Sequence, residues 1–131
     1  MSSYLSVRKN NEELFSFSRN DDIYQSVNNH LKYGEWEQVT QSTLAMILED
    51  IEEDVHNTKL AIQREEKALP HLKDTEAIYE AVASTQSLEE SLKDYERVKW
   101  FIRFLSMILE EIQWEHKDAN EEPSKLEWRI D

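Results

Sequence analysis

Residues 44–69 read LAMILEDIEEDVHNTKLAIQREEKAL, and this stretch decides the fold. Positions separated alternately by four and three residues form one stripe along it: Leu44, Leu48, Ile51, Val55, Thr58, Ile62, Glu65 and Leu69. This is the heptad pattern of a long helix that packs along another helix, as in a coiled coil. We therefore expect a helix from about residue 35 to residue 69, ended by Pro70.

A second helical pattern follows a short connector at residues 71–74. Its apolar stripe starts with Ile78 and Val82 and continues through Leu88, Leu92, Tyr95, Val98, Ile102, Leu105, Leu109 and Ile112. Ser87-Leu88-Glu89-Glu90 is a capping box, which can restart or kink the helix there. Two helices of about thirty residues, each about 45 Å long, predict an antiparallel helical hairpin over residues 35–116.

The first 34 residues predict a different local structure. Residues 4–9 and 14–18 alternate apolar and polar side chains, and Asn10 to Glu13 provide a four-residue turn. This pattern predicts a β-hairpin that presents Leu5, Val7, Phe15 and Phe17 on one face. Because an isolated hairpin is marginal in water, that face must pack on the rest of the chain.

A short helix and a C-terminal tail complete the expected organisation. Residues 20–22 provide a cap for a helix carrying Ile23, Val27 and Leu31, which Gly34 ends. Residues 117–125 are polar and contain Pro123, whereas residues 126–130 alternate again and favour a third strand or a docked peptide. The chain is thus expected to be one mainly α domain with three segments, 1–34, 35–116 and 117–131.

The composition excludes several classes of protein. A single glycine leaves no glycine-rich phosphate loop, and the absence of cysteine excludes disulfides and cysteine metal sites. The longest apolar-rich stretch, residues 100–114, is too short to span a bilayer. The first residues lack the apolar segment of a signal peptide, so we expect a cytoplasmic protein.

The apolar residues of the segment 100–114 surround the helix more completely than one packed face requires. We therefore expect a homo-oligomer, a dimer or larger, and assign its interface to Trp100, Phe101, Phe104, Met107, Ile108 and Trp114. In the alternative, the β-hairpin and the short helix cover this segment within one chain.

The net charge of −13 belongs to residues 35–131, because residues 1–34 contain four acidic and four basic residues. An acidic face over Glu49, Glu52, Glu53 and Asp54 is the candidate surface for a basic partner. Glu53 and His56 also form an E-x-x-H pair with Glu49 one turn before it, which leaves a metal-dependent helical-bundle enzyme that uses the acidic cluster of residues 49–56 as an alternative. A solvated acidic helix face is the simpler interpretation.

The sequence contains no recognisable catalytic motif and no cofactor motif, so we expect a protein that is not an enzyme. The acidic surface would repel a nucleic-acid backbone, and no amphipathic stretch has the basic face that binds membranes. The leading hypothesis is an inhibitor or adaptor that binds another protein, a role common among small acidic virus-encoded factors. A purely structural oligomerisation module is a further alternative.

Overall fold

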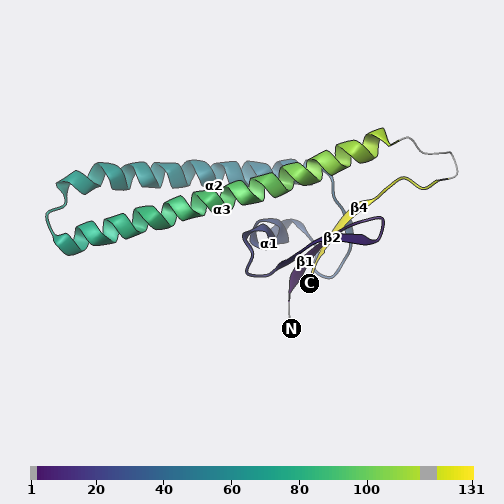
Figure 1. The fold of residues 1–131 in the computed structure, drawn as a ribbon, viewed down its shortest axis with the longest axis horizontal. Helices are drawn as coiled ribbons and strands as arrows, with labels where there is room; N and C mark the ends of the chain where they lie inside the picture. Colours follow the sequence, from purple (N-terminus) through teal and green to yellow (C-terminus); the bar gives the residue numbers. More distant parts are fainter. Residues whose placement is uncertain (1–2, 116–120) are drawn as a thin grey trace.

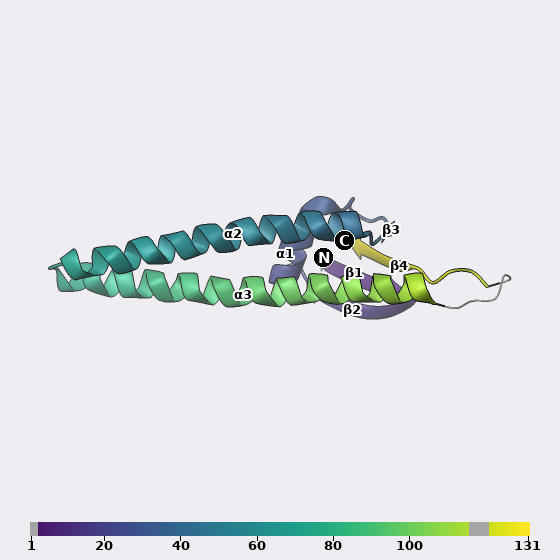
Figure 2. The same ribbon diagram turned by 90° about the horizontal axis from the view of Figure 1, so that it is seen from above.

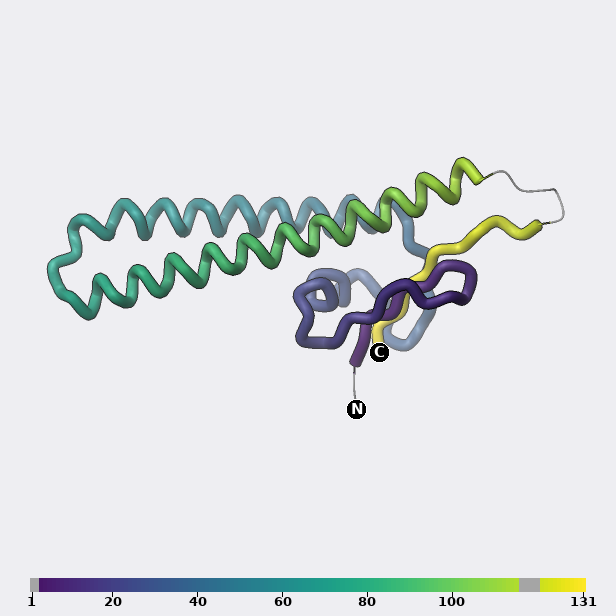
Figure 3. Tube along the Cα trace, in the orientation of Figure 1, coloured from purple at the N-terminus to yellow at the C-terminus, as the bar shows by residue number. Residues whose placement is uncertain are grey.

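The computed structural model describes residues 3–115 and 121–131, and two long helices lie side by side above a small β-sheet (Figure 1). Helix α2 spans Gln41–Ala68, helix α3 spans Thr75–Trp114, and a 3₁₀ turn η2 at Leu69–His71 follows α2. The predicted mainly α fold with a long antiparallel helical hairpin is confirmed. The half of this hairpin that contains the turn extends well beyond the sheet (Figures 2 and 3).

Helix α2 begins later than its sequence pattern predicted. The side chain of Thr40 accepts a hydrogen bond from the Thr43 amide at 3.2 Å, which caps the helix at residue 40 rather than near residue 35. Residues 37–38 instead form strand β3. The predicted end of the helix is nearly correct, because α2 ends at Ala68, two residues before Pro70.

Helix α3 is one continuous helix of 40 residues, capped by Asp74, whose carboxylate accepts from the Glu76 amide at 3.2 Å. The restart or kink that the capping box at Ser87 allowed does not occur. No glycine or proline occurs between residues 75 and 114 to interrupt the helix. The Ser87 carbonyl accepts a hydrogen bond from the Ser91 hydroxyl at 3.2 Å within the helix.

In the part of the chain that the structure describes, the sheet has four antiparallel strands in the order β2-β1-β4-β3. Strand β1 is Tyr4–Lys9, β2 is Glu12–Ser18, and β4 is Leu126–Ile130. Residues 126–130 therefore form a third strand next to the hairpin, which confirms one of the two predictions made for them. Strand β3, Glu37–Gln38, was not predicted, because two residues are too few to show a pattern.

The turn between β1 and β2 is shorter than expected. Glu12 and Glu13 belong to β2, and only Asn10 and Asn11 turn the chain, with φ angles of 53° and 70°. Asparagine tolerates this left-handed conformation better than most residues do. Asn10 also binds the C-terminal tail. Its backbone amide donates to the Lys125 carbonyl at 3.0 Å, and its side-chain oxygen accepts from the Lys125 backbone amide at 2.9 Å.

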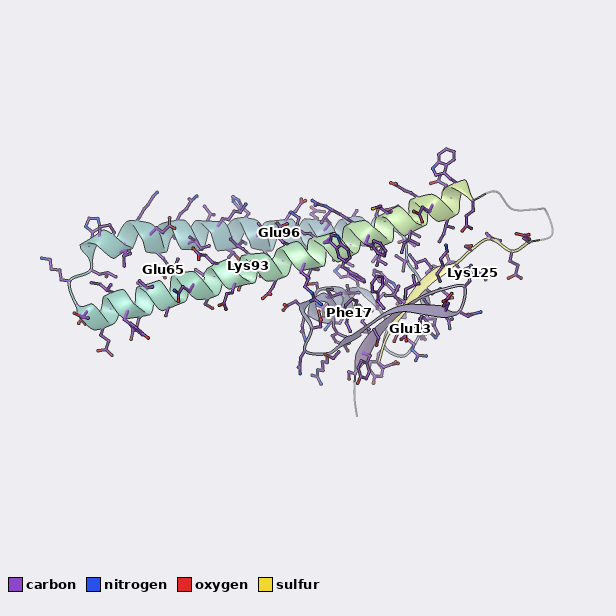
Figure 4. The ribbon with its side chains drawn as sticks, in the orientation of Figure 1. Glu13, Phe17, Glu65, Lys93, Glu96 and Lys125 are labelled. Atoms are coloured by element: carbon purple, nitrogen blue, oxygen red, sulfur yellow. The ribbon has the colours of Figure 1, made fainter. Side chains whose placement is uncertain are left out.

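The predicted apolar face of the hairpin covers the C-terminal half of α3. Leu5 and Val7 are fully buried opposite Phe17 and Phe15. The rings of Phe15 and Phe17 lie edge-on to Phe101, with centroid separations of 5.5 and 5.1 Å. Figure 4 shows Phe17 below α3. Strand β4 adds Trp128, the largest fully buried side chain among the described residues.

The short helix α1, Asp22–Val27, lies against both long helices and buries Ile23, Tyr24 and Val27. It is shorter than predicted: a 3₁₀ turn η1, Asn28–His30, follows Val27, and Leu31 lies outside the helix. Gly34 does not end the helix but occupies the following loop with a φ of +77°.

The outer part of the helical hairpin has no buried core of its own. No residue between Ile51 on α2 and Val98 on α3 is buried, and only Val55 and Tyr95, at the inner end, are among the residues packed partly against the core. Glu65, a position of the predicted stripe, accepts a hydrogen bond from Ser84 at 3.5 Å across the two helices. We call residues 55–95 the arm.

Replacement of the buried indole in β4 tests where the fold obtains its stability. Trp128→Ala is expected to lower the free energy of unfolding by about 3–5 kcal/mol, because it leaves a cavity between sheet and helix. Tyr79→Ala, on the arm and 77% exposed, is the control, with an expected change within about 0.5 kcal/mol. Urea unfolding followed by circular dichroism measures both, and similar losses in the two variants would contradict this core.

Candidate functional site

A pocket of about 680 Å³ lies where α1 and η1 meet the two long helices, at the end of the arm nearest the sheet. Seen from above, α1 is placed between α2 and α3 where these helices diverge (Figure 2). The volume is within the range of about 300–1,000 Å³ that binding pockets usually occupy.

Acidic side chains dominate the rim of this pocket. Five carboxylates from three helices line it: Asp22 from α1, Asp50, Glu53 and Asp54 from α2, and Asp94 from α3. No lysine or arginine is among the described lining residues. His30 Nε2 lies 3.4 Å from Asp50 Oδ2 and can become charged only by gaining a proton. The pocket therefore carries a concentrated negative charge.

The floor of the pocket is apolar. Ile47, Ile51 and Val98 line it and are buried in the core that joins the helices to the sheet. Tyr95 adds a half-buried aromatic ring. A ligand that combines a hydrocarbon stem with a cationic head would match both the floor and the rim.

Asp21 and Arg97 link α1 to α3 next to the pocket. The Arg97 guanidinium donates two hydrogen bonds to the Asp21 carboxylate, at 2.7 and 2.9 Å. The hydrogen bond from Arg97 lowers the pKa of Asp21, and Asp21 in turn raises the pKa of Arg97. For Asp22, partial burial raises the pKa, and the charge of Asp94 across the pocket raises it further.

The acidic face proposed from the sequence is divided by the structure. Glu53 and Asp54 line the pocket, whereas Glu49 and Glu52 lie outside its lining. Asp22, Asp50 and Asp94 were not predicted to belong to this face. Asp50 was visible in the same acidic run, but Asp22 and Asp94 are 72 residues apart, and only the tertiary fold brings α1 and α3 together.

The metal-binding alternative rested on Glu53 and His56. Glu53 lines the pocket, but His56 is exposed on α2 outside the lining. Within residues 3–115 and 121–131, no group of three or more histidine, aspartate or glutamate side chains is placed to hold a metal ion. In the same described part of the chain, no helix is long and apolar enough to cross a membrane.

The residues assigned to an oligomer interface separate into two groups. Phe101 and Ile108 are 0% and 8% exposed and pack inside the chain, so their assignment to a surface is corrected. Phe15 and Phe17 of the β-hairpin lie edge-on to Phe101. Trp100, Met107 and Trp114 remain 60%, 57% and 82% exposed.

Phe104 lies between these two groups. It is half-buried, stacked on Trp100 at 5.5 Å and edge-on to Phe15 at 5.6 Å. It thereby connects the exposed indole of Trp100 to the aromatic contacts beneath the helix.

The comparisons give no relative for this chain, since no protein-family model, curated protein or solved structure matches it. The geometry and charge of the pocket and of the exposed residues are therefore the basis for a functional proposal.

A pH experiment tests the Asp21–Arg97 link. Asp21→Asn keeps a residue that caps helices well but loses the ion pair. Because half of Arg97 is exposed, the expected loss in the free energy of unfolding is only about 0.5–1 kcal/mol at neutral pH. The folded-state pKa of Asp21 lies below 3.8, so this contribution is present above pH 3.8 and disappears as the pH falls through that pKa.

Urea unfolding of the parent chain and Asp21→Asn at neutral pH and at about pH 2 measures this dependence. The two curves should converge at the lower pH. A difference that is equally large at both pH values would show that the ion pair is not its cause.

Proposed function

We propose that the protein is a non-enzymatic interaction module that binds a basic segment of a partner protein in the acidic pocket. One observation carries this proposal: five carboxylates from three helices line one pocket that has no lysine or arginine among its described lining residues. Like charges held together destabilise a fold unless something compensates them, and a cationic ligand supplies that compensation.

Several basic residues outside the pocket are paired within the chain. Arg8 contacts Glu127 at 3.2 Å, Lys9 contacts Glu115 at 3.4 Å, and Arg97 holds Asp21. Because these basic side chains are paired elsewhere, they do not neutralise the carboxylates of the pocket. This arrangement favours binding of a cation from outside the chain.

Arginine fits the pocket better than lysine. Its planar guanidinium can bind a carboxylate through two hydrogen bonds and stack on an aromatic ring such as Tyr95. Its hydrocarbon stem can lie on the floor formed by Ile51 and Val98. We therefore propose an arginine-bearing segment as the preferred ligand.

The proposed module acts in the cytoplasm as an inhibitor or adaptor, as small virus-encoded acidic proteins do, and not by contacting nucleic acid or membranes. Its negative surface would steer a basic partner toward the pocket, and nucleic-acid phosphates would be repelled. The heptad pattern of the arm favours coiled-coil packing of α2 on α3. We also propose that the chain self-associates through the exposed residues of α3.

Calorimetric titration with an oligoarginine peptide tests the pocket. We expect binding that weakens steeply with salt and is tighter than binding of an oligolysine peptide of equal length. The triple variant Asp50→Asn, Asp54→Asn and Asp94→Asn should weaken binding at least about tenfold, since each lost charged hydrogen bond costs roughly 1.5–3 kcal/mol.

A control variant loses the same charge outside the pocket: Glu49→Gln, Glu52→Gln and Glu90→Gln. All three side chains are exposed on α2 or α3 and do not line the pocket. We expect its affinity for oligoarginine to stay within about twofold of the parent, because only long-range attraction changes. Equal weakening in the two triple variants would show binding by net charge alone and would reject the pocket as the site.

A further inference from the structure

The exposed face of α3 carries three large apolar side chains at equal spacing. Trp100, Met107 and Trp114 are separated by seven residues each, which is close to two helical turns, so they form one stripe. Val98 precedes Met107 by nine residues, about two and a half turns, and is fully buried. The stripe therefore lies on the side of α3 opposite the core.

The charges beside this stripe are arranged asymmetrically. Residues 97–103 contain three basic and no acidic residues, whereas residues 110–115 contain three acidic and no basic residues. Within the described residues, Arg103, Glu110 and Glu111 form no salt bridge. One end of the stripe thus has free positive charge and the other end has free negative charge.

We propose that two copies of the chain pair antiparallel along α3, about a two-fold axis that passes at Met107. This inference rests on the self-association proposed above and specifies its geometry. Trp100 and Trp114 stand seven residues before and after Met107, so each Trp100 meets Trp114 of the second copy. Arg103 stands four residues before Met107 and Glu110 stands three residues after it, and both lie on the same flank of the stripe, so each Arg103 meets Glu110 of the second copy.

Charge excludes the parallel arrangement with the same stripe. An in-register parallel pair places every residue beside its own counterpart, so Arg103 would face Arg103 and Glu110 would face Glu110. Like charges directly across a helix interface are destabilising, whereas the antiparallel pair joins opposite charges at both ends.

The area of the stripe is a large part of what a specific interface buries. A buried aromatic side chain contributes about 150–250 Å², so four indoles and two methionines approach 1,000 Å² before their neighbours are counted. Specific interfaces usually bury about 1,200–2,000 Å², which the flanking residues of α3 can supply. α2 and the sheet lie on other sides of α3, and the acidic pocket faces α1, so pairing leaves the pocket open.

Sedimentation equilibrium of the full chain across the micromolar range, at physiological ionic strength, tests self-association. We expect the parent to shift from monomer to dimer with concentration and Trp114→Gln to remain monomeric at concentrations at least about tenfold higher. Tyr79→Gln is the matched control, because Tyr79 is a 77% exposed aromatic residue on the same helix outside the stripe. Equal loss of dimer in both variants would overturn the stripe as the interface.

A charge exchange tests which residues face each other. Arg103→Glu alone and Glu110→Arg alone should each weaken the dimer, because each places like charges across the axis. The double variant should restore the parental dissociation constant to within about threefold. These positions are seven residues apart on one helix, about 10 Å along its axis, and do not pair within a chain, so a double variant no better than either single variant would overturn the antiparallel register.

Single cysteines test the direction of pairing in a chain that has no other cysteine. Met107→Cys lies on the proposed axis and should form a disulfide with its own counterpart under mild oxidation. Arg103→Cys would be displaced about 12 Å along the axis from its counterpart, beyond the roughly 7 Å reach of a disulfide, and should not. Cross-linking of Arg103→Cys without Met107→Cys would overturn the antiparallel geometry.

The outcomes separate the proposals. A parent chain that stays monomeric throughout rejects self-association and the antiparallel pairing together, while leaving the peptide titration of the pocket unaffected. A dimer that resists Trp114→Gln or cross-links in parallel rejects only the pairing described here.

Discussion

The contact between the sheet and the C-terminal half of α3 is the interaction on which the rest of the molecule depends. Phe15 and Phe17 of the hairpin lie edge-on to Phe101, and Trp128 of the last strand is buried in the same core. An isolated β-hairpin and an isolated helix pair are both marginal in water, and each covers the apolar surface that the other exposes. Because α1 is attached to this core, the same contact also fixes the acidic pocket between α1 and the long helices.

Helix α3 therefore has two parts with different roles. From Val98 to Ile108 it belongs to the core, whereas in the arm α3 packs mainly along α2, with no buried residue between Ile51 and Val98. The acidic pocket lies where these parts meet, and the stripe of Trp100, Met107 and Trp114 lies on the opposite side of the core segment. In the proposed dimer, two such pockets would be held at a fixed separation on rigid supports, with both arms free.

The sequence was sufficient for features that repeat along the chain. The heptad stripe from Leu44 predicted α2 and the hairpin, and alternation predicted β1, β2 and the strand formed by residues 126–130. It was insufficient where spatial neighbours are distant in sequence: Asp22 and Asp94 meet in the pocket only because α1 packs on α3. The burial of Phe101 was missed for the same reason, since the hairpin that covers it lies more than 80 residues earlier. Strand β3 has two residues and exists only because β4 pairs with it.

Hydrogen exchange measured by mass spectrometry tests most directly whether the contact of sheet and helix organises the molecule. We predict that amides around Phe101 and in β1 and β4 share the slowest exchange, because they open together in global unfolding. Amides between residues 60 and 90 should exchange faster through local opening of the arm. Uniform protection along α3, or a sheet that exchanges independently of residues 98–108, would contradict a common core.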